Sequence, residues 1–300
     1  MRQLRLSPTG QAQRVPTLRR MNNTLTAADG LALHLQHWPV EGPARGTVLV
    51  VHGLGEHIGR YARVAARLNG WGWNVVGYDQ RGHGRSAGAL GRLNHADDLL
   101  CDLAFVIDAL QAQTAGALVL LGHSLGGLVA ARFVAEELAA PPAAWARPVD
   151  ALVLSSPALD PGMNAGQKLL LALVGPLAPN LGVNNGLNPD WISRDKSVVQ
   201  AYVADPLVHD RIAPRLARFI VDSGEAVLRH APQWRLPTLL LYAGSDRCVA
   251  PAGSAAFAAA APNASVTVHE FPALFHEIFN EPEQAEVFAA LGTWLAGRGH

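Results

Sequence analysis

The sequence predicts an open α/β fold in which a mainly parallel sheet is covered by helices on both faces. Short, continuously apolar runs alternate along the chain with helix-length amphipathic stretches. Such runs are typical of parallel strands that are buried on both faces, and their alternation with helices indicates successive βαβ units. The chain has 300 residues, of which 49% are hydrophobic and 16% charged, so it can bury the large core that this fold requires.

The individual elements follow from the hydrophobic pattern. The run Gly30–Trp38 alternates between apolar and polar residues, which favours an antiparallel strand at the edge of the sheet. The parallel strands are expected at Thr47–His52, Asn74–Asp79, Leu118–Gly122, Ala151–Ser155, Thr238–Ala243 and Ser265–Phe271. The helices are expected at Tyr61–Leu68, Ala96–Gln113, Leu125–Leu138, Ala252–Ala260 and Glu283–Ala296.

The alternation stops at residues 157–236, which contain many Pro and Gly, several short helix candidates and no convincing strand. Loops of this length without secondary structure are uncommon in compact domains. We therefore expect a helical cap, residues 157–236, inserted before the strand 238–243, with residues 21–156 and 237–300 forming the core. The most apolar part of the cap, Lys168–Leu177, has two interpretations. It is either a helix packed on the core, or an apolar surface that faces a pocket or a membrane.

Composition narrows the classes of function. The 24 basic residues balance 24 acidic ones, which argues against non-specific electrostatic binding to nucleic acid. Two cysteines, Cys101 and Cys248, cannot form a disulfide framework, and no zinc-ligand spacing occurs. We expect free thiols in a reducing, cytoplasmic compartment and no metal. There is also no P-loop and no G-x-G-x-x-G after a strand, so no cofactor is expected.

The amino-terminal residues and the hydropathy give no sign of a membrane span. No window of 18 apolar residues exists, so no transmembrane helix is expected. Residues 1–20 contain five Arg and lack the apolar stretch of a secretory signal, and we expect them to form a disordered tail.

The sharpest functional signal is the motif GHSLGG at residues 122–127, which lies between an apolar strand and an apolar helix. This context is the one that a nucleophile elbow requires. The turn would hold Ser124 in a strained conformation at the tip of the strand, and only small residues at Gly122 and Gly126 would let the flanking segments approach. The N-terminus of the helix would favour a developing anion beside Ser124. We predict that Ser124 is a catalytic nucleophile.

A serine hydroxyl needs a general base, and the base needs a group that orients it. In elbow-containing hydrolases the chain order is Ser, then acid, then His. Asp246 follows a predicted strand, where such sites are built, although a turn-forming role is the alternative. His276 lies just beyond the last predicted strand, whereas the competing His269 lies inside it. We predict His276 as general base and acid, with Asp246 orienting its imidazole.

Acyl transfer also needs donors for the oxyanion, and the loss of one donor costs roughly 3–4 kcal/mol. One predicted donor is the backbone N–H of Leu125, the residue after the nucleophile. We predict the N–H of Leu54 as the second donor, in the loop that follows the strand 47–52. The alternative for this loop is an ordinary Gly-rich turn.

Four segments resemble monoacylglycerol lipases. HGLGEHIGRY at residues 52–61 is similar to their oxyanion loop, DQRGHGRS at 79–86 to the loop after the next strand, and ADPLV at 204–208 is typical of their cap. With the elbow, the resemblance spans about residues 30–295 and points to the lysophospholipase-like and serine aminopeptidase S33-type α/β-hydrolases. It implies an α/β-hydrolase fold with a cap, and acylglycerols or similar esters as substrates. It places Ser124, Asp246 and His276 on the family's triad, and Leu54 and Leu125 on its oxyanion donors.

The expected function is therefore a serine hydrolase that cleaves carboxylic esters, above all monoacylglycerols, through an acyl-enzyme. A small lipid or ester would be the partner, with transient membrane contact through the cap. Leu170, Leu173, Val174 and Leu177 would line an acyl channel.

Several alternatives remain open. A lysophospholipase, an aminopeptidase or an acyltransferase would use the same triad. An aminopeptidase would bind the substrate ammonium with cap carboxylates, for which Asp190, Asp195 and Asp205 are available. A non-catalytic ligand receptor is the alternative from another class. Epoxide hydrolases and dehalogenases are disfavoured because they use Asp at the elbow.

Overall fold

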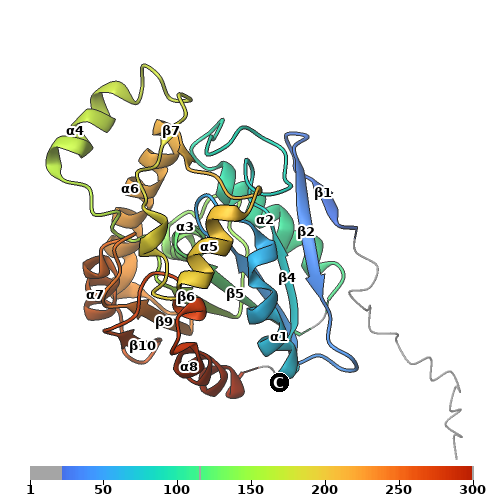
Figure 1. Cartoon of the computed structure of the whole chain (residues 1–300). Coiled ribbons are helices and arrows are strands. Elements are labelled where there is room, and N and C mark those ends of the chain that lie inside the picture. The colour runs from blue at the N-terminus through green and yellow to red at the C-terminus, as the bar shows by residue number, and fades with distance from the viewer. Residues whose placement is uncertain (1–21, 115, 299–300) are drawn as a thin grey trace, which may run out of the picture.

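The computed structural model describes residues 22–114 and 116–298, so the predicted tail at residues 1–20 lies outside the described residues. Eight strands form one sheet in the order β1-β2-β4-β3-β5-β6-β9-β10 (Figure 1). Strand β2 pairs antiparallel with both β1 and β4, and the other pairs are parallel. The strands are β1 (Thr24–Thr26), β2 (Ala32–Trp38), β3 (Gly46–Val51), β4 (Asn74–Tyr78), β5 (Ala117–His123), β6 (Ala151–Ser155), β9 (Thr238–Ala243) and β10 (Val266–Phe271).

Alternating side chains of the strands fill two cores, one on each face of the sheet. In β3, Leu49 and Val51 belong to one core, whereas Val48 and Val50 belong to the other. The first core is closed by α2 (Asp98–Gln111), α3 (Leu125–Ala135), α6 (Pro214–His230) and α7 (Pro251–Ala260), and the second by α1 (Ala62–Gly70) and α8 (Gln284–Ala296).

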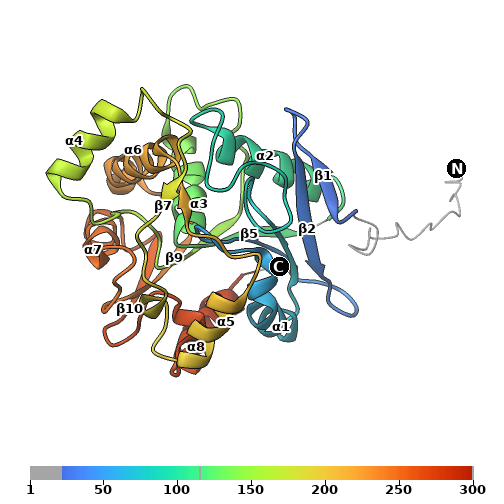
Figure 2. The same ribbon diagram turned by 45° about the horizontal axis from the view of Figure 1, so that its top comes forward.

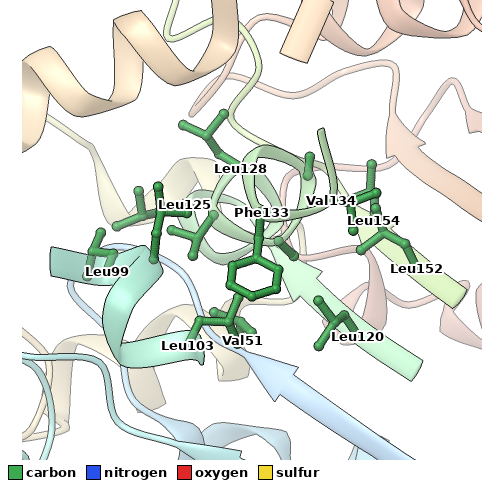
Figure 3. Packing of buried hydrophobic residues seen from close by; sticks show 14 of the residues in the cluster. Val51, Leu99, Leu103, Leu120, Leu125, Leu128, Phe133, Val134, Leu152 and Leu154 are labelled. Atoms are coloured by element: carbon green, nitrogen blue, oxygen red, sulfur yellow. The ribbon is translucent and has the colours of Figure 1, made fainter. Parts of the chain in front are cut away.

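Helix α3, which follows Ser124, is buried in the first core. Figure 3 shows Phe133 of α3 above Val51 and Leu120 of the sheet and close to Leu103 of α2. Ten of the residues in α3 are buried, so the helix is fixed by packing along most of its length. A rigid α3 gives Ser124, at its N-terminus, a fixed position above the sheet.

The fold agrees with the predicted open, mainly parallel α/β sheet, with two differences in the strands. Strand β1 has only three residues and pairs with β2 through the backbone register Thr24↔His34 to Thr26↔Ala32. A run this short carries no hydrophobic period, so the sequence could not predict it. Strand β2 is antiparallel as predicted, but because β1 pairs with it, the prediction that β2 forms the edge of the sheet was wrong. The expectation of no strand in residues 157–236 was also wrong, because β7 (Val183–Asn184) pairs with β8 (Arg211–Ile212).

Residues 157–236 contain α4 (Ala165–Val174), α5 (Lys196–Ala204) and α6, together with the β7–β8 pair. Helix α6 packs against α3 and α7, and its Leu216, Phe219, Ile220 and Val227 join the first core. Although α6 belongs to the predicted cap, it therefore packs as part of the core. Helix α4, by contrast, protrudes from the body of the molecule (Figures 1 and 2).

Three leucine side chains of α4, those of Leu169, Leu170 and Leu173, face solvent. Leu170 and Leu173 are 61% and 65% exposed, and Leu177 beyond the helix is 84% exposed. The interpretation of α4 as a helix packed on the core is therefore wrong. Among the described residues, no helix combines the length and hydropathy needed to cross a bilayer.

Candidate active site

Ser124 lies in a tight turn between β5 and α3. Its φ of 53° and ψ of −121° place it in a strained region of backbone space. A Cβ at Gly122 would overlap the carbonyl of Gly126, and a Cβ at Gly126 would overlap that of Val51. The turn therefore depends on glycine at both positions because the backbone segments are in direct contact.

His276 and Asp246 form a short hydrogen bond. Asp246 follows β9 and His276 follows β10, two strands that are neighbours in the sheet. His276 Nδ1 lies 2.6 Å from Asp246 Oδ2, and both side chains are buried. Asp246 Oδ1 accepts hydrogen bonds from the N–H groups of Cys248 and Val249, which fix the carboxylate. Because Nδ1 is engaged, Nε2 is the nitrogen left to accept a proton.

Ser124 and His276 line the same cavity of about 460 Å³. We call it the polar cavity because charged side chains, among them Glu56, Asp205 and Glu277, also line it. The ring centroid of His123, next to Ser124 in the chain, lies 4.7 Å from that of His276, with the two rings tilted by 52°. Within the described residues no hydrogen bond joins the Ser124 hydroxyl to His276. Such contacts are often long in the absence of substrate and tighten on binding. The competing His269 lies within β10.

Opposing effects set the pKa of His276. Burial lowers its pKa, but the charge of Asp246 and the hydrogen bond to it, with Glu277 and Glu56, raise the pKa above 6.5 overall. Burial and His276 lower the pKa of His123 to about 4, so His123 is neutral near pH 7.

This balance predicts the pH dependence of activity. His276 must be neutral to accept a proton, so kcat/KM should fall as the pH drops through its raised pKa. We expect the midpoint of the acid limb above pH 6.5. The measurement is kcat/KM for a neutral ester from about pH 5 to about pH 9. An acid limb centred below 6.5 would contradict the assignment of His276.

The predicted oxyanion donors flank Ser124. Leu54 and Ser124 both line the polar cavity, and Leu54, Ser124 and Leu125 line a second cavity of about 280 Å³. Leu125 is the first residue of α3, so its N–H has no partner within the helix. An added Cβ on Gly53 would lie only 3.2 Å from Ser124 Cβ, which shows how closely the loop at 53–54 approaches Ser124.

The second cavity, the apolar cavity, differs in its lining. It shares Leu54, Ser124, Asn185, Leu187 and Cys248 with the polar cavity. Its apolar walls include Leu54, Leu125, Met163, Leu187, Ile212 and Ile220.

Three of the four predicted acyl-channel residues do not contribute to these walls. Leu170, Leu173 and Leu177 line neither cavity at Ser124 and instead point to solvent, and the side chain of Val174 is not described. The correction has a physical reason, because α4 stands away from the sheet. The segments around Met163, Leu187 and Ile212 approach Ser124 in its place. These residues lie in or beside irregular segments with no hydrophobic period, so no sequence signal singled them out.

One group of potential metal ligands coincides with this site. Ligand atoms of Asp246, Cys248 and His276 lie within 4.8 Å of one another. Burial and the nearby Asp246 raise the pKa of the Cys248 thiol well above its usual value, so it is protonated. A metal here would have to displace both that proton and the hydrogen bond between Asp246 and His276. The chemistry of the donor set thus favours an acid–base pair over a metal site.

A strained serine at a strand-to-helix elbow, above a mainly parallel sheet and beside a His–Asp pair, defines an α/β-hydrolase. The family model described as "Serine aminopeptidase, S33" matches residues 42–283, and the chain belongs to this family.

Relatives of known name agree with this class. The chain is 31% identical to the monoacylglycerol lipase of Mycolicibacterium smegmatis, over 92% of this chain and 97% of that protein. It is 30% identical to a phospholipase of Bacillus subtilis, over 84% and 95% of the two chains. The crystal structure of Paleococcus ferrophilus monoacylglycerol lipase superimposes with a TM-score of 0.78 at 34% identity, covering 88% of this chain and 98% of that one. These matches confirm the predicted fold, the resemblance to monoacylglycerol lipases and the class of carboxylic ester hydrolase.

Proposed function

We propose that the protein hydrolyses monoacylglycerols, with Ser124, His276 and Asp246 as its catalytic triad. The observation that carries the proposal is the strained Ser124 in the same cavity as the hydrogen-bonded pair of His276 and Asp246. The relatives named monoacylglycerol lipase support the choice of substrate.

The proposed reaction proceeds through an acyl-enzyme. Ser124 Oγ attacks the ester carbonyl while His276 Nε2 takes its proton, and the oxyanion accepts hydrogen bonds from the N–H groups of Leu54 and Leu125. As the tetrahedral intermediate collapses, His276 returns the proton to the leaving glycerol oxygen. Water, deprotonated by His276, then attacks the acyl carbon. The fatty acid leaves and Ser124 recovers its proton.

The two cavities at Ser124 suggest how an ester would be divided between them. The apolar cavity suits an acyl chain, and the polar cavity suits the alcohol portion. Four carboxylates line the polar cavity, Glu56, Asp205, Asp210 and Glu277, against two guanidinium groups, that of Arg211 in the lining and that of Arg60 paired with Glu56 and Glu277. This excess of negative charge disfavours an anionic head group, so the proposal favours glycerol over a phosphate ester.

A substrate panel tests the choice of head group. We expect kcat/KM for 1-lauroylglycerol to exceed that for 1-lauroylglycerol 3-phosphate by at least about 10-fold, because the phosphate would face the carboxylates of the polar cavity. Initial rates of lauric acid release measure both substrates, with the Ser124→Ala protein as blank. Equal or faster turnover of the phosphate ester would refute the proposed substrate class and favour a phospholipase.

The aminopeptidase alternative finds little support in the carboxylates. Asp205 is hydrogen-bonded to His57 Nε2 at 2.8 Å, and Asp190 and Asp195 lie outside the polar cavity. Each carboxylate that lines the polar cavity already has a partner within the protein, so an ammonium group would compete with His57, Arg60 or Asn184 for it. Adding proline 4-nitroanilide to the panel tests this alternative, and we expect no turnover.

We also propose that residues 157–236 act as a cap and that α4 docks on the membrane surface. Leu169, Leu170 and Leu173 are each at least 60% exposed, which is unusual for large apolar side chains of one helix. With free Cys101 and Cys248, a reducing cytoplasmic face of the membrane is the proposed location.

A vesicle assay tests the docking. Burial of Leu170 and Leu173 in the headgroup region would stabilise binding, so the double change Leu170→Ser with Leu173→Ser should lower the fraction bound to phosphatidylcholine vesicles at least about 5-fold. Co-sedimentation measures the fraction bound. Val268→Ser, which alters an exposed apolar residue of β10, is the control. Equal binding of the double variant and the wild type would remove the proposal.

A further inference from the structure

A buried ion-pair network joins the loop of Leu54 to the loop of His276. The guanidinium of Arg60 lies between two carboxylates, Glu56 and Glu277, whose side chains are 5% and 7% exposed. Arg60 Nη1 donates to Glu56 Oε2 at 2.5 Å. Its Nη1 and Nη2 donate to the two oxygens of Glu277 at 2.7 and 2.8 Å. This planar, two-sided arrangement requires the fork of an arginine, which a lysine cannot reproduce.

At one end, the network holds the loop of the proposed oxyanion donor. Glu56 Oε1 accepts the N–H of Gly53 at 2.6 Å and the hydroxyl of Tyr61, also at 2.6 Å. Gly53 directly precedes Leu54. Although burial opposes ionisation of Glu56, Arg60 and nearby histidines lower its pKa to about 2, so it is a carboxylate at neutral pH. The position of the carboxylate therefore fixes the main chain just before Leu54.

At the other end, the network holds the loop of the proposed base. Glu277 directly follows His276, and its N–H donates to the carbonyl of Ile192 in the cap at 2.8 Å. The side chain of Asn280 also donates to Glu277 Oε2 at 2.8 Å. In addition, the ring of Tyr202 in α5 lies 4.8 Å from the Arg60 guanidinium. One side chain thus contacts the oxyanion loop, the base loop and the cap.

We infer that Arg60 is a positioning residue that sets the Leu54 N–H and the His276 imidazole relative to each other around Ser124. This inference rests on the proposed function, because it assigns Arg60 a role in the same acyl transfer. Arg60 forms no part of the proposed triad or oxyanion hole and acts through Glu56 and Glu277. A displacement of about 1 Å between groups that must act together can cost about 10²-fold in rate.

The conservative variant Arg60→Lys tests the inference. A lysine keeps the positive charge between the two carboxylates, so we expect the protein to fold, with circular dichroism like that of the wild type. It cannot bridge both carboxylates in the same geometry. We therefore expect kcat for 4-nitrophenyl laurate to fall about 10²-fold with KM changed less than about 3-fold. Labelling of Ser124 by a fluorophosphonate should slow by a similar factor.

A second variant and a control keep the test decisive. Glu277→Gln keeps the shape of the side chain but weakens its two hydrogen bonds with Arg60. It should lower kcat about 10-fold at the alkaline plateau of the pH profile. Arg63→Lys is the matched control, because Arg63 lies on the exposed side of α1 and donates to Gln284. If Arg60→Lys does not fold, Glu277→Gln decides alone.

The outcomes separate the inference from the proposed function. Folded Arg60→Lys protein with wild-type kcat, or a change in KM alone, overturns the inference, as does wild-type kcat in Glu277→Gln. A wild-type protein that neither turns over esters nor reacts with the fluorophosphonate overturns the proposed function instead.

Discussion

Replacing Ser124 with alanine should lower kcat by about 10⁴-fold or more, because the acyl-enzyme can no longer form. The fold should persist. The side chain loses only a hydroxyl, and the backbone strain at φ 53° is the same for alanine as for serine. The measurement is the initial rate on 4-nitrophenyl laurate together with the midpoint of thermal unfolding.

The control for this variant is Ser254→Ala, which removes a buried hydroxyl in α7 that lines neither cavity at Ser124. We expect Ser254→Ala to keep its activity. If the Ser124→Ala protein hydrolysed the ester at a rate near that of the wild type, the acyl-enzyme mechanism would be ruled out.

Replacing Asp246 with asparagine should have a comparable effect, about 10⁴-fold on kcat, for a reason that lies in the hydrogen bonds. Asp246 Oδ1 accepts from the N–H groups of Cys248 and Val249, so the amide oxygen of asparagine would take that place. Its NH₂ group would then face His276 Nδ1. The imidazole would have to accept a hydrogen bond at Nδ1 and carry its own proton on Nε2. With that nitrogen protonated, it could no longer act as a base toward Ser124.

Steady-state rates and the pH profile together measure this effect. Because the charge of Asp246 raises the pKa of His276, residual activity in Asp246→Asn should extend to lower pH than in the wild type. The exposed Asp222, which pairs with Arg218 in α6, supplies the control Asp222→Asn. Retention of more than about a tenth of the wild-type kcat in Asp246→Asn would show that His276 does not depend on this carboxylate.

The parts of the molecule that sequence could predict are those with local patterns. The apolar runs at β3, β5 and β9 identify buried parallel strands, because an apolar run without alternation indicates burial on both faces. The elbow at Ser124 is equally local, since a few neighbouring residues determine the turn. The order of the chain then restricts the predicted acid and base to residues after β9 and β10.

The parts that sequence could not predict depend on tertiary contacts. The apolar stretch in α4 predicted a helix, but its composition could not show that Leu170 and Leu173 face solvent rather than the cavity. The pairing of Arg60 with Glu277 spans 217 residues and follows only from the approach of two loops. The cavity walls at Leu187 and Ile212 likewise arise from the path of the cap over the sheet.

The chemical identity of the nucleophile tests the central claim most directly. The protein would be treated with a fluorophosphonate, digested, and its peptides analysed by mass spectrometry, with the His276→Ala protein treated in parallel. We predict a single phosphonate adduct on Ser124 in the wild type and a strongly reduced rate of its formation in the variant. An adduct on a different residue, or unchanged labelling without the imidazole, would contradict the claim that Ser124 is activated by His276.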